Sequence, residues 1–411
     1  MSVDVRTRVD RAVDDAWLVD PHEFFTSTLP AAIDANAAGI IAGLRFVQPR
    51  AASIEVNGEA FTLAFDDDRV RIDSGVRDGA AHVRLSAEQL ADLVHDQSTF
   101  MAWWANGALD QPRGTVGHLM NWWLVVRAAL DGLAIYTPGS VTFTDAGGAP
   151  LDLRRTFRPD DDPAAMHHFL TEAGFMRVVG LFDTEEMAAI AADMDVAAQT
   201  RREGDGRSWW ARTADGTSRV VRMQGFDQDS AAASELLRDD RFVQLATLSG
   251  AGHRFTRRPE NRMEALFKPI GVTEGISDIP WHKDCGLGRH SYECCGMTVG
   301  ISVTGADETS GQLHALAGSH RALVWSSVMQ PNLDLPDVPL PTQTGDITIH
   351  LSCTMHMAQP PTERERRVMY SGFGLPPLEH ADPAAAARGR SRLGEVRESA
   401  PITVLDRHFK S

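Results

Sequence analysis

Cysteine is scarce in this sequence of 411 residues, which contains four of them. Cys285, Cys294, Cys295 and Cys353 lie in one half of the chain, without a C-x-x-C spacing and without a secretion context. This pattern excludes a disulfide framework and a zinc knuckle as the basis of the fold. We therefore expect reduced thiols.

Long apolar runs and an excess of positive charge are also missing. No run approaches the roughly 20 residues needed to cross a bilayer, and the segment MSVDVRTRVDRAVDD lacks the apolar stretch of a secretory signal. The formal net charge is −16, whereas a nucleic-acid surface needs a cationic face. We expect a cytoplasmic protein with no membrane span and no nucleic-acid partner.

The composition supplies enough apolar material for two cores. Hydrophobic residues make up 43% of the chain and charged residues 23%, as in globular proteins, and the length exceeds what one core usually fills. No sequence period repeats along the chain. We predict a first domain over residues 1–138, a linker rich in Gly, Pro and Asp over 139–156, and a second domain over 157–411.

The first domain has the pattern of an α+β unit. A helix is predicted over residues 22–46, and the segments ASIEVNG, EAFTLAF, DRVRIDS and AHVRLS alternate in polarity like the strands of a meander. An Asn-Gly dipeptide at 57–58 forms a favoured hairpin turn between the first two. Ser86 and Gln89 then open a helix as a capping box, and an apolar helix over 118–132 closes the unit.

This order of elements resembles the sterol carrier protein type 2 fold: a strand meander, the LSAEQLADLV helix, a connection containing ANGAL and a final apolar helix. The resemblance implies a sheet and helices around an apolar tunnel that carries lipids. A packed core without a ligand is the alternative, because bulky apolar side chains are normally buried in cores. The side chains that fit either interpretation are Trp103, Trp104, Met120, Trp122 and Trp123.

The second domain begins with a helix, a short strand FMRVVG and a further helix that Asp183 and Glu186 open as a capping box. Strand-like segments broken by Gly, Pro and Asp follow: SRVVRM, RMEALFKP, GMTVGISVT, DITIHLS and RRVMYSGFG. So many short strands indicate a barrel or a jelly roll.

The segment PWHKDCGLGRH places His282 two residues before Asp284. Two histidines and one carboxylate form a facial triad that leaves open positions on a non-haem Fe(II), so a second histidine is expected downstream. His380 and Asp382 repeat the spacing in EHADP, but no strand with a histidine and an arginine follows them. We assign that second pair to a surface loop.

The downstream candidates lie in GDITIHLSCTMHMAQPPTERERRVMYSGFG, which contains His350, His356, Arg366 and Arg367. A hairpin that turns at residues 361–362 sets His356 opposite Arg367, so that both side chains point into one cavity. A planar guanidinium is the best partner for a carboxylate. We predict His356 as the third metal ligand and Arg367 as the carboxylate anchor, with Arg366 as the alternative anchor.

Several of these segments resemble the phytanoyl-CoA dioxygenase family over residues 155–375. GISVTGADETSGQLHALAGSHR contains the family's Gly-Ser-His stretch, FLTEAGFMRVVGLFDTEEM resembles its N-terminal edge, and Arg367 stands eleven positions after His356, where the family has an arginine. The resemblance implies a double-stranded β-helix (a jelly-roll or cupin-like fold) that binds Fe(II), 2-oxoglutarate and O2, oxidises a C–H bond and releases succinate and carbon dioxide. Ala358 and Pro361 depart from the small hydroxyl residue and the asparagine of many members, so one hydrogen bond to the keto acid is missing or comes from elsewhere.

Asp284 also discriminates within this class. Relatives that halogenate have a small residue in its place, so that chloride binds the iron. The carboxylate therefore favours hydroxylation, desaturation or ring formation over halogenation. We expect a small, largely apolar substrate, such as a lipid or a natural-product intermediate.

Further residues are predicted to line the site. Polar and apolar residues alternate in MTVGISVT as in a barrel wall, and Lys268, Thr298 and Ser302 are candidates for contact with the keto acid or the substrate. Trp281 and Trp325 either border the substrate or belong to the core. We assign structural or supporting roles to His290, His314, His320 and His350. Of these four, His350 is the one we would test first.

Other functions stay open. A lipid-binding or docking protein would have an oxygenase-like half without turnover and a first domain that carries the function. A zinc hydrolase is disfavoured, because such sites more often need only one open position. The first domain could equally cover the mouth of the active site or form a subunit contact, and the sequence leaves the oligomeric state open.

Overall fold

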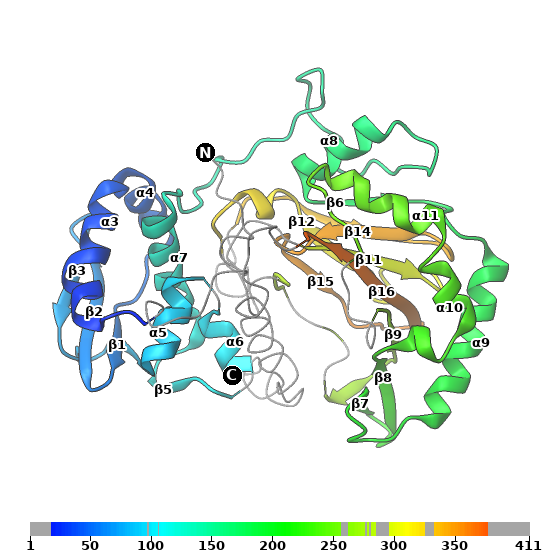
Figure 1. Ribbon diagram of the computed structural model, residues 1–411, viewed down its shortest axis with the longest axis horizontal. Coiled ribbons are helices and arrows are strands. Elements are labelled where there is room, and N and C mark those ends of the chain that lie inside the picture. Colours follow the sequence, from blue (N-terminus) through cyan, green and yellow to red (C-terminus); the bar gives the residue numbers. More distant parts are fainter. Residues whose placement is uncertain are drawn as a thin grey trace.

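The computed structural model describes residues 18–376 except 97, 106, 256–261, 276–277, 279–280, 285–295 and 325–332. Figure 1 shows this described part as two bodies, each with its own hydrophobic core. The first core draws on residues between Phe24 and Ile135 together with Leu323, and the second on residues between Phe157 and Phe373. The domain limits given above stay predictions, because both chain ends lie outside the described residues.

The first body opens with the helices α2 (Pro21–Glu23), η2 (Phe24–Thr28, a π-helical turn), α3 (Leu29–Ala35) and α4 (Ala37–Val47). The single helix predicted over 22–46 is interrupted at Asn36. Its side-chain amide donates hydrogen bonds to the backbone carbonyls of Ala128 and Leu133. The backbone of Asn36 has a φ of −122° and a ψ of 26°, which lie outside the helical region, so the helix is broken there.

A five-stranded sheet follows, with the order β3-β2-β1-β4-β5. Its strands are β1 (Ala52–Val56), β2 (Glu59–Asp66), β3 (Arg69–Ser74), β4 (Ala81–Leu85) and β5 (Asp110–Arg113). The first three form the predicted meander, but β4 pairs in parallel with β1, so that part of the prediction is wrong. Alternating polarity identifies a strand without specifying its neighbour, and β4 buries its apolar face beside the free edge of β1.

Three helices complete this body: α5 (Ala87–Val94), α6 (Phe100–Ala105) and α7 (Val116–Asp131). The predicted capping box of Ser86 and Gln89 is confirmed at the start of α5. The apolar helix α7 ends at Gly132, which has a φ of +69° and so suits glycine. Trp122 and Trp123 of α7 are buried in the first core.

The second body begins with the predicted helix, strand and helix, which are α8 (Pro163–Ala173), β6 (Phe175–Val178) and α9 (Thr184–Thr200). Asp183 and Glu186 form the expected capping box of α9. Shorter helices follow: η3 (Phe226–Gln228), α10 (Ala231–Leu236), α11 (Asp240–Val243) and η4 (Gln244–Ser249).

Two sheets form the rest of the second body, which confirms its β-rich character. The larger has the order β10-β7-β8-β9-β16-β11-β14-β6, and the smaller has the order β13-β12-β15. The large-sheet strands not yet bounded are β7 (Ser208–Thr213), β8 (Ser218–Met223), β9 (Glu264–Lys268), β10 (Val272–Glu274), β11 (Gly296–Ser302), β14 (Ile347–Leu351) and β16 (Arg366–Gly374). The small sheet has β12 (Leu313–Leu316), β13 (Asp337–Leu340) and β15 (His356–Ala358), and η6 (Ser319–Arg321) follows β12.

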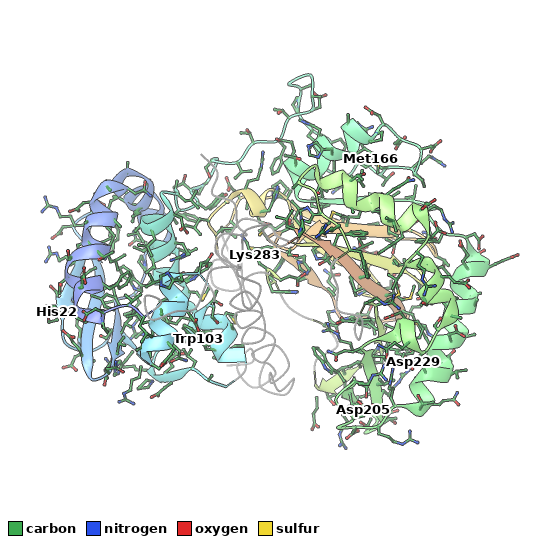
Figure 2. All side chains as sticks on the ribbon, viewed as in Figure 1. His22, Trp103, Met166, Asp205, Asp229 and Lys283 are labelled. Carbon is green, nitrogen blue, oxygen red and sulfur yellow. The ribbon has the colours of Figure 1, made fainter. Side chains whose placement is uncertain are left out.

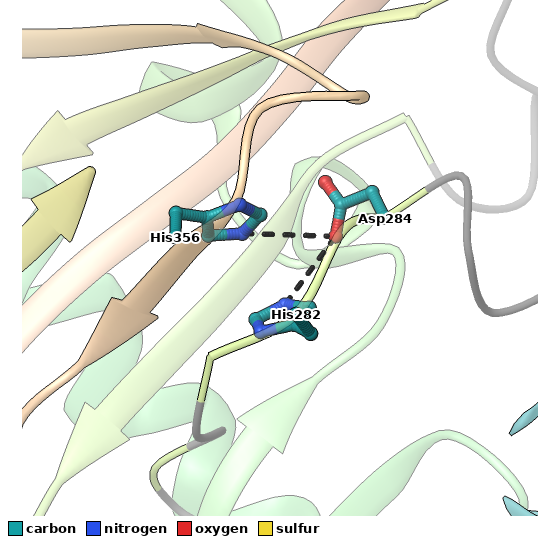
Figure 3. A group of neighbouring side chains, drawn as sticks. All are labelled: His282, Asp284 and His356. Atoms are coloured by element: carbon teal, nitrogen blue, oxygen red, sulfur yellow. Dashed lines mark ion pairs between the residues drawn. The ribbon is translucent and has the colours of Figure 1, made fainter. Parts of the chain in front are cut away.

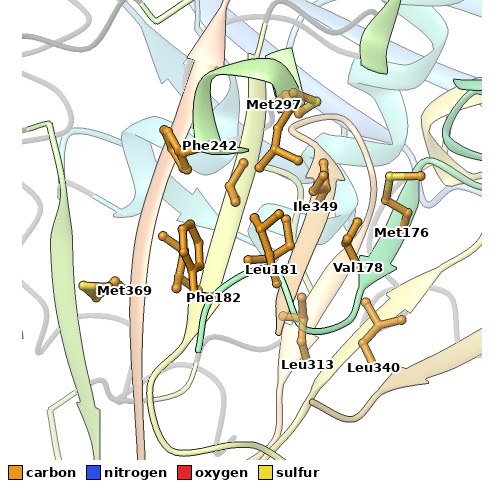
Figure 4. Close-up of a cluster of buried hydrophobic side chains, with 14 of the residues drawn as sticks. Met176, Val178, Leu181, Phe182, Phe242, Met297, Leu313, Leu340, Ile349 and Met369 are labelled. Carbon is orange, nitrogen blue, oxygen red and sulfur yellow. The ribbon is translucent and has the colours of Figure 1, made fainter. Parts of the chain in front are cut away.

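Alternation along β11 and β14 gives the large sheet two different faces. Apolar side chains such as Met297 and Ile349 share the second core with residues of the helices, among them Phe242 of α11 (Figure 4). The residues between them are smaller or polar: Thr298, Gly300, Ser302, Thr348 and His350. Members of this second set line a cavity together with Leu313 and Leu340 of the small sheet, so the cavity lies between the two sheets.

Candidate metal centre

The structure brings His282, Asp284 and His356 together, as Figure 3 shows. One ligand atom of each lies within 4.8 Å of the others. The Asp284 Oδ1 atom is 3.6 Å from His282 Nε2 and 3.8 Å from His356 Nε2. Two imidazole nitrogens and one carboxylate oxygen at this spacing fit a facial triad on one metal ion.

Main-chain pairing positions the two histidines. His282 and His356 form an isolated antiparallel bridge, in which each backbone NH donates to the carbonyl of the other at 3.0 and 2.9 Å. The His356 Nδ1 atom lies 2.9 Å from the backbone carbonyl of Thr354. Because a carbonyl only accepts, Nδ1 carries the proton and Nε2 keeps its lone pair towards Asp284.

The Asp284 carboxylate uses its two oxygens differently. Oδ1 faces the two triad histidines, whereas Oδ2 accepts a hydrogen bond from Thr298 Oγ1 at 3.1 Å and lies 3.5 Å from His350 Nε2. One oxygen is therefore directed at the metal position and the other is held by the protein. This arrangement favours monodentate binding of a metal by Asp284.

The pKa shifts of Asp284 and His356 favour the protonation states that bind a cation. Burial by itself raises the pKa of the Asp284 carboxyl, but the imidazoles of His356, His282 and His350 outweigh this effect and hold it well below its usual range. Burial, followed by the neighbouring His350 and His282, lowers the pKa of His356 well below its ordinary value. An ionised carboxylate and a neutral imidazole are the forms that bind metals, so few protons need to leave.

His350 is a residue whose importance the sequence left open. It pairs with Thr298 across β14 and β11, and its ring centroid is 4.0 Å from that of His356. The side chain is 1% exposed, and its closest polar contact is Asp284 Oδ2, which lies 3.5 Å from Nε2. The alternation of Thr348 and His350 in GDITIH is the sequence signal that places it on the inner face.

Arg367 does not face this centre, and the prediction that it shares a cavity with His356 is wrong. Its guanidinium lies on the helix-covered face, where Nη2 is 2.8 Å from Asp195 Oδ1 and Nη1 donates to the carbonyl of Ala191 at 3.0 Å. The expected hairpin does not form either. The strand β15 pairs with β12 in the small sheet, whereas β16 pairs with β9 and β11 in the large sheet.

Arg366, the alternative anchor, lies on the inner face and lines the cavity between the sheets. It is 4% exposed, and its Nε and Nη2 atoms have no hydrogen-bond partner in the described part of the chain. A buried guanidinium with unused donors is costly, so the site suits an anionic ligand that would bond them. The remaining lining residues are Gly300, Ser302, Ala306, Leu313, Leu340, Thr342, Thr348, Val368 and Tyr370.

Groups beside Arg366 add a further positive charge and a hydroxyl. Lys268 is the cross-strand partner of Arg366, and its ammonium is 3.3 Å from Asp278 Oδ1. Burial lowers the pKa of Lys268 to about 8. Burial also raises the pKa of Tyr370, which lines the same cavity as Arg366. Sequence reasoning missed Tyr370.

The remaining predicted residues lie in various places. Ser302 shares a hydrogen bond of 2.9 Å with Thr342, His314 bonds Asp337, and His320 bonds the carbonyl of Thr171. Trp281 packs against a small apolar cluster, and Cys353 is a buried thiol. Several positions lie outside the described residues: Cys285, His290, Cys294, Cys295, Trp325, His380 and Asp382.

Comparison with known proteins supports the class of this domain. Residues 170–368 match the family model described as Phytanoyl-CoA dioxygenase (PhyH). The match confirms the family resemblance for this segment of the chain. No curated protein matches the chain.

Three solved structures are each similar to about half of this chain. AviO1 from Streptomyces viridochromogenes Tue57 is 21% identical, with 54% of this chain and 98% of that chain covered and a TM-score of 0.43. SnoN, a non-haem α-ketoglutarate-dependent epimerase from nogalamycin biosynthesis, is 19% identical, with 52% and 82% covered and a TM-score of 0.41. EctD from S. alaskensis with bound Fe is 16% identical, with 55% and 82% covered and a TM-score of 0.42. In the described part of the chain, no helix combines the length and apolarity needed to span a membrane.

Proposed function

We propose that this protein is an Fe(II)- and 2-oxoglutarate-dependent dioxygenase. The proposal rests on one observation: a candidate metal-binding group and a buried cation lie at opposite ends of the space between the two sheets. His282, Asp284 and His356 form a metal-binding group at one end, and the buried Arg366 presents unused donors at the other. The family match over residues 170–368 supports the same conclusion.

The donor set fits Fe(II) with open positions for further ligands. Two histidines and one carboxylate occupy one side of the ion and leave the adjacent positions free, whereas a structural zinc site would be closed by four protein ligands. Fe(II) held here would supply the activation of O2 for oxidation of an unactivated C–H bond. Hydrogen bonds to Asp284 and His356 keep the ligand atoms oriented.

The cationic end suits the distal carboxylate of 2-oxoglutarate. Arg366 offers a planar fork of donors, and Lys268, its cross-strand partner, adds a second positive charge. Ser302, Thr342 and Tyr370 present hydroxyl groups around the same cavity. Because the lining side chains Arg366, Ser302 and Thr342 are buried, charge-assisted hydrogen bonds to a dicarboxylate are stronger there than at the surface.

We propose oxidation at a C–H bond, with hydroxylation as the first expectation and desaturation or ring formation as its variants. Asp284 occupies the position that halogenation would need for chloride. A small, largely apolar metabolite is the proposed substrate, and succinate and carbon dioxide are the proposed co-products.

Binding and turnover test this function directly. The protein is mixed without oxygen with Fe(II) and 2-oxoglutarate, and the visible charge-transfer absorption of a chelated keto acid is expected. Oxygen and a metabolite extract are then added, and succinate and oxidised products are measured by mass spectrometry. If neither the absorption nor succinate above the protein-free level is found, the proposed function is wrong.

Substitution of His350 tests how Asp284 is oriented. In His350→Phe the ring is kept but its nitrogens are lost, so we expect Co(II) to bind roughly 10- to 100-fold more weakly, as when other groups that orient metal ligands are removed. His350→Gln keeps an NH donor and should retain affinity within a few-fold. Isothermal titration with Co(II) measures both.

A matched control for this test is His314→Gln, because His314 bonds Asp337 on the small sheet and is absent from the triad. It should bind Co(II) like the unmodified protein. Equal affinity of His350→Phe and the unmodified protein would show that Asp284 does not depend on His350.

The lowered pKa of Lys268 predicts a pH dependence of co-substrate binding. Since the pKa is about 8, the charge of Lys268 is lost above that pH, and the KM for 2-oxoglutarate should rise by up to about tenfold per pH unit. In Lys268→Arg the charge persists, so the KM should stay flat between pH 7 and 9. A rise of equal size in both proteins would exclude Lys268 as the cause.

The titration of Lys268 does not destabilise the folded protein as the pH rises, so unfolding through Lys268 cannot account for a rise in the KM. Its folded-state pKa lies below the value in the unfolded chain, so between these pKa values the unfolded state binds more protons. The contribution of Lys268 to the free energy of unfolding therefore improves as the pH rises through this window, while binding of the keto acid weakens.

For residues 1–138 we propose a sterol carrier protein type 2-like α+β fold, which the helix-covered five-stranded sheet supports. Lipid carriage does not follow from this fold. Trp122 and Trp123 are both 1% exposed within the first core, which favours the packed-core interpretation. Displacement of a fluorescent fatty acid from the full-length protein tests lipid carriage.

A further inference from the structure

A third apolar cluster joins the two bodies. Its buried members are Tyr136, Leu316, Ala322, Val324, Leu335 and Met355, and Phe46, Val141, Trp281 and Leu333 pack against them. Phe46 comes from α4 of the first body, and its ring makes an edge contact with Tyr136 at 5.9 Å between centroids. We name this set the bridging cluster.

The bridging cluster includes the residues next to two predicted metal ligands. Trp281 directly precedes His282, and Met355 directly precedes His356. Met355 is fully buried, and the two histidines pair with each other through their backbones. Packing of the cluster therefore restrains both ligand-bearing segments directly beside their histidines.

A short segment after β12 connects the same parts by hydrogen bonds. Leu323 is 3% exposed in the first core, forms a parallel bridge with Ile135 and accepts a hydrogen bond of 3.0 Å from the NH of Tyr136. Ser319 Oγ accepts a hydrogen bond of 2.8 Å from the NH of Met355. The segment is thus attached to the first body at one end and to the His356 strand at the other.

Lys283 extends this connection to the other ligand segment. It lies between His282 and Asp284, is 2% exposed and is labelled in Figure 2 on the side of the second body that faces the first. Its ammonium donates to the carbonyl of Ser319 at 2.7 Å and lies 3.4 Å from that of Ala322. Both ligand segments therefore contact residues 319–323.

Within the first body, the helix α4 packs closely on the segment that reaches this region. A Cβ atom at Gly43 of α4 would lie 2.3 Å from the Cβ of Ile135, so the glycine allows the helix to pack directly on the segment that pairs with Leu323. Phe46 lies one helical turn further along α4 and reaches Tyr136. The contact between the two bodies is built from backbone pairing and apolar packing.

We propose that the first body is a structural part of the metal centre, and that Phe46 is a positioning residue that acts through the bridging cluster on His282 and His356. This inference rests on the proposed function only for the metal-binding role of the two histidines. It assigns the first body a role that needs no lipid ligand: the metal-binding geometry depends on its packing.

The test compares two phenylalanines of the first body in the full-length protein. Phe46→Ala removes the aromatic contact of the bridging cluster. Phe65→Ala, in β2, removes an equally half-buried ring that packs against the first core alone. We expect Co(II) to bind roughly tenfold more weakly to Phe46→Ala, as when groups that orient metal ligands are lost, and to bind Phe65→Ala as it binds the unmodified protein. Phe46→Leu should restore most of the affinity.

Hydrogen exchange supplies a measurement that needs no metal. The backbone NH groups of His282, Met355 and His356 are hydrogen-bonded, so peptides that contain them should exchange faster in Phe46→Ala and unchanged in Phe65→Ala. Unchanged exchange and Co(II) affinity in Phe46→Ala, or equal effects in both variants, would overturn the inference. If exchange responds as expected but the unmodified protein does not bind Co(II), the proposed function fails and the coupling of the two bodies stands.

Discussion

Replacement of Asp284 with alanine is expected to reduce 2-oxoglutarate-dependent succinate formation to the protein-free level. Asp284 supplies the carboxylate of the triad, and its Oδ1 lies within 4 Å of both histidine nitrogens. Loss of the metal removes several kcal/mol of transition-state stabilisation, so a fall in rate of about a thousandfold or more is expected. Succinate measured by mass spectrometry and Co(II) affinity measured by calorimetry should fall together.

A suitable control is Asp337→Ala. Asp337 also pairs with a histidine, His314, at 2.8 Å, but this pair is on the small sheet and its carboxylate is half-exposed. The control should retain both metal binding and turnover. Succinate formation by Asp284→Ala at the rate of the unmodified protein would contradict the assignment of the metal centre.

The second large effect is expected on the KM for 2-oxoglutarate, and it should differ between the adjacent residues Arg366 and Arg367. In Arg366→Leu the KM for 2-oxoglutarate should rise by about 10- to 150-fold, because one charge-assisted hydrogen bond contributes roughly 1.5–3 kcal/mol. In Arg367→Leu it should change less than about twofold, since Arg367 pairs with Asp195 on the helix-covered face. The partly exposed ion pair of Arg367 is worth at most about 1 kcal/mol of stability, so this variant folds.

Thermal unfolding separates binding from folding in this pair. Arg366 is buried with two guanidinium nitrogens lacking partners in the described structure, so leucine at this position should leave the Tm unchanged or raise it. Arg366→Lys keeps the charge and should recover part of the affinity. A large rise of the KM in Arg367→Leu together with a small one in Arg366→Leu would show that Arg367 is the carboxylate anchor. Arg367 is also the residue that the family spacing predicts.

The arginine pair also shows where sequence reasoning ended. Period-two alternation places Arg366 and Arg367 on opposite faces of a strand, but which face is inside depends on the neighbouring strand. The assumption that β15 and β16 form a hairpin led to Arg367. In the structure the chain between these strands passes from the small sheet to the large one, and β16 pairs with β9 and β11 instead.

The same limit applies to β4 and to His350. The segment AHVRLS identifies a strand, but its parallel pairing with β1 depends on an edge that the first three strands leave free. The position of His350 beside Asp284 depends on the pairing of β14 with β11. In both cases the missing information is the identity of a partner distant in sequence.

The sequence by itself determined those features that depend on residues close together along the chain. It determined the capping boxes at Ser86 and Asp183 and the alternation along the strands. It also indicated His282, Asp284 and His356 as candidate ligands, although the hairpin used to choose His356 does not form. Helix caps and alternation depend on neighbours a few residues away, so they can be read along the chain.

Only the tertiary structure decided which strands pair, which arginine faces the cavity and how the first body contacts the segments of the candidate metal ligands. These features depend on contacts between residues separated by tens or hundreds of positions, such as Ile135 with Leu323 and Phe46 with Tyr136. A shift of one residue in strand pairing exchanges the two faces of a strand at almost no change in local preference. Long-range packing therefore chooses between arrangements that the local sequence leaves nearly equal.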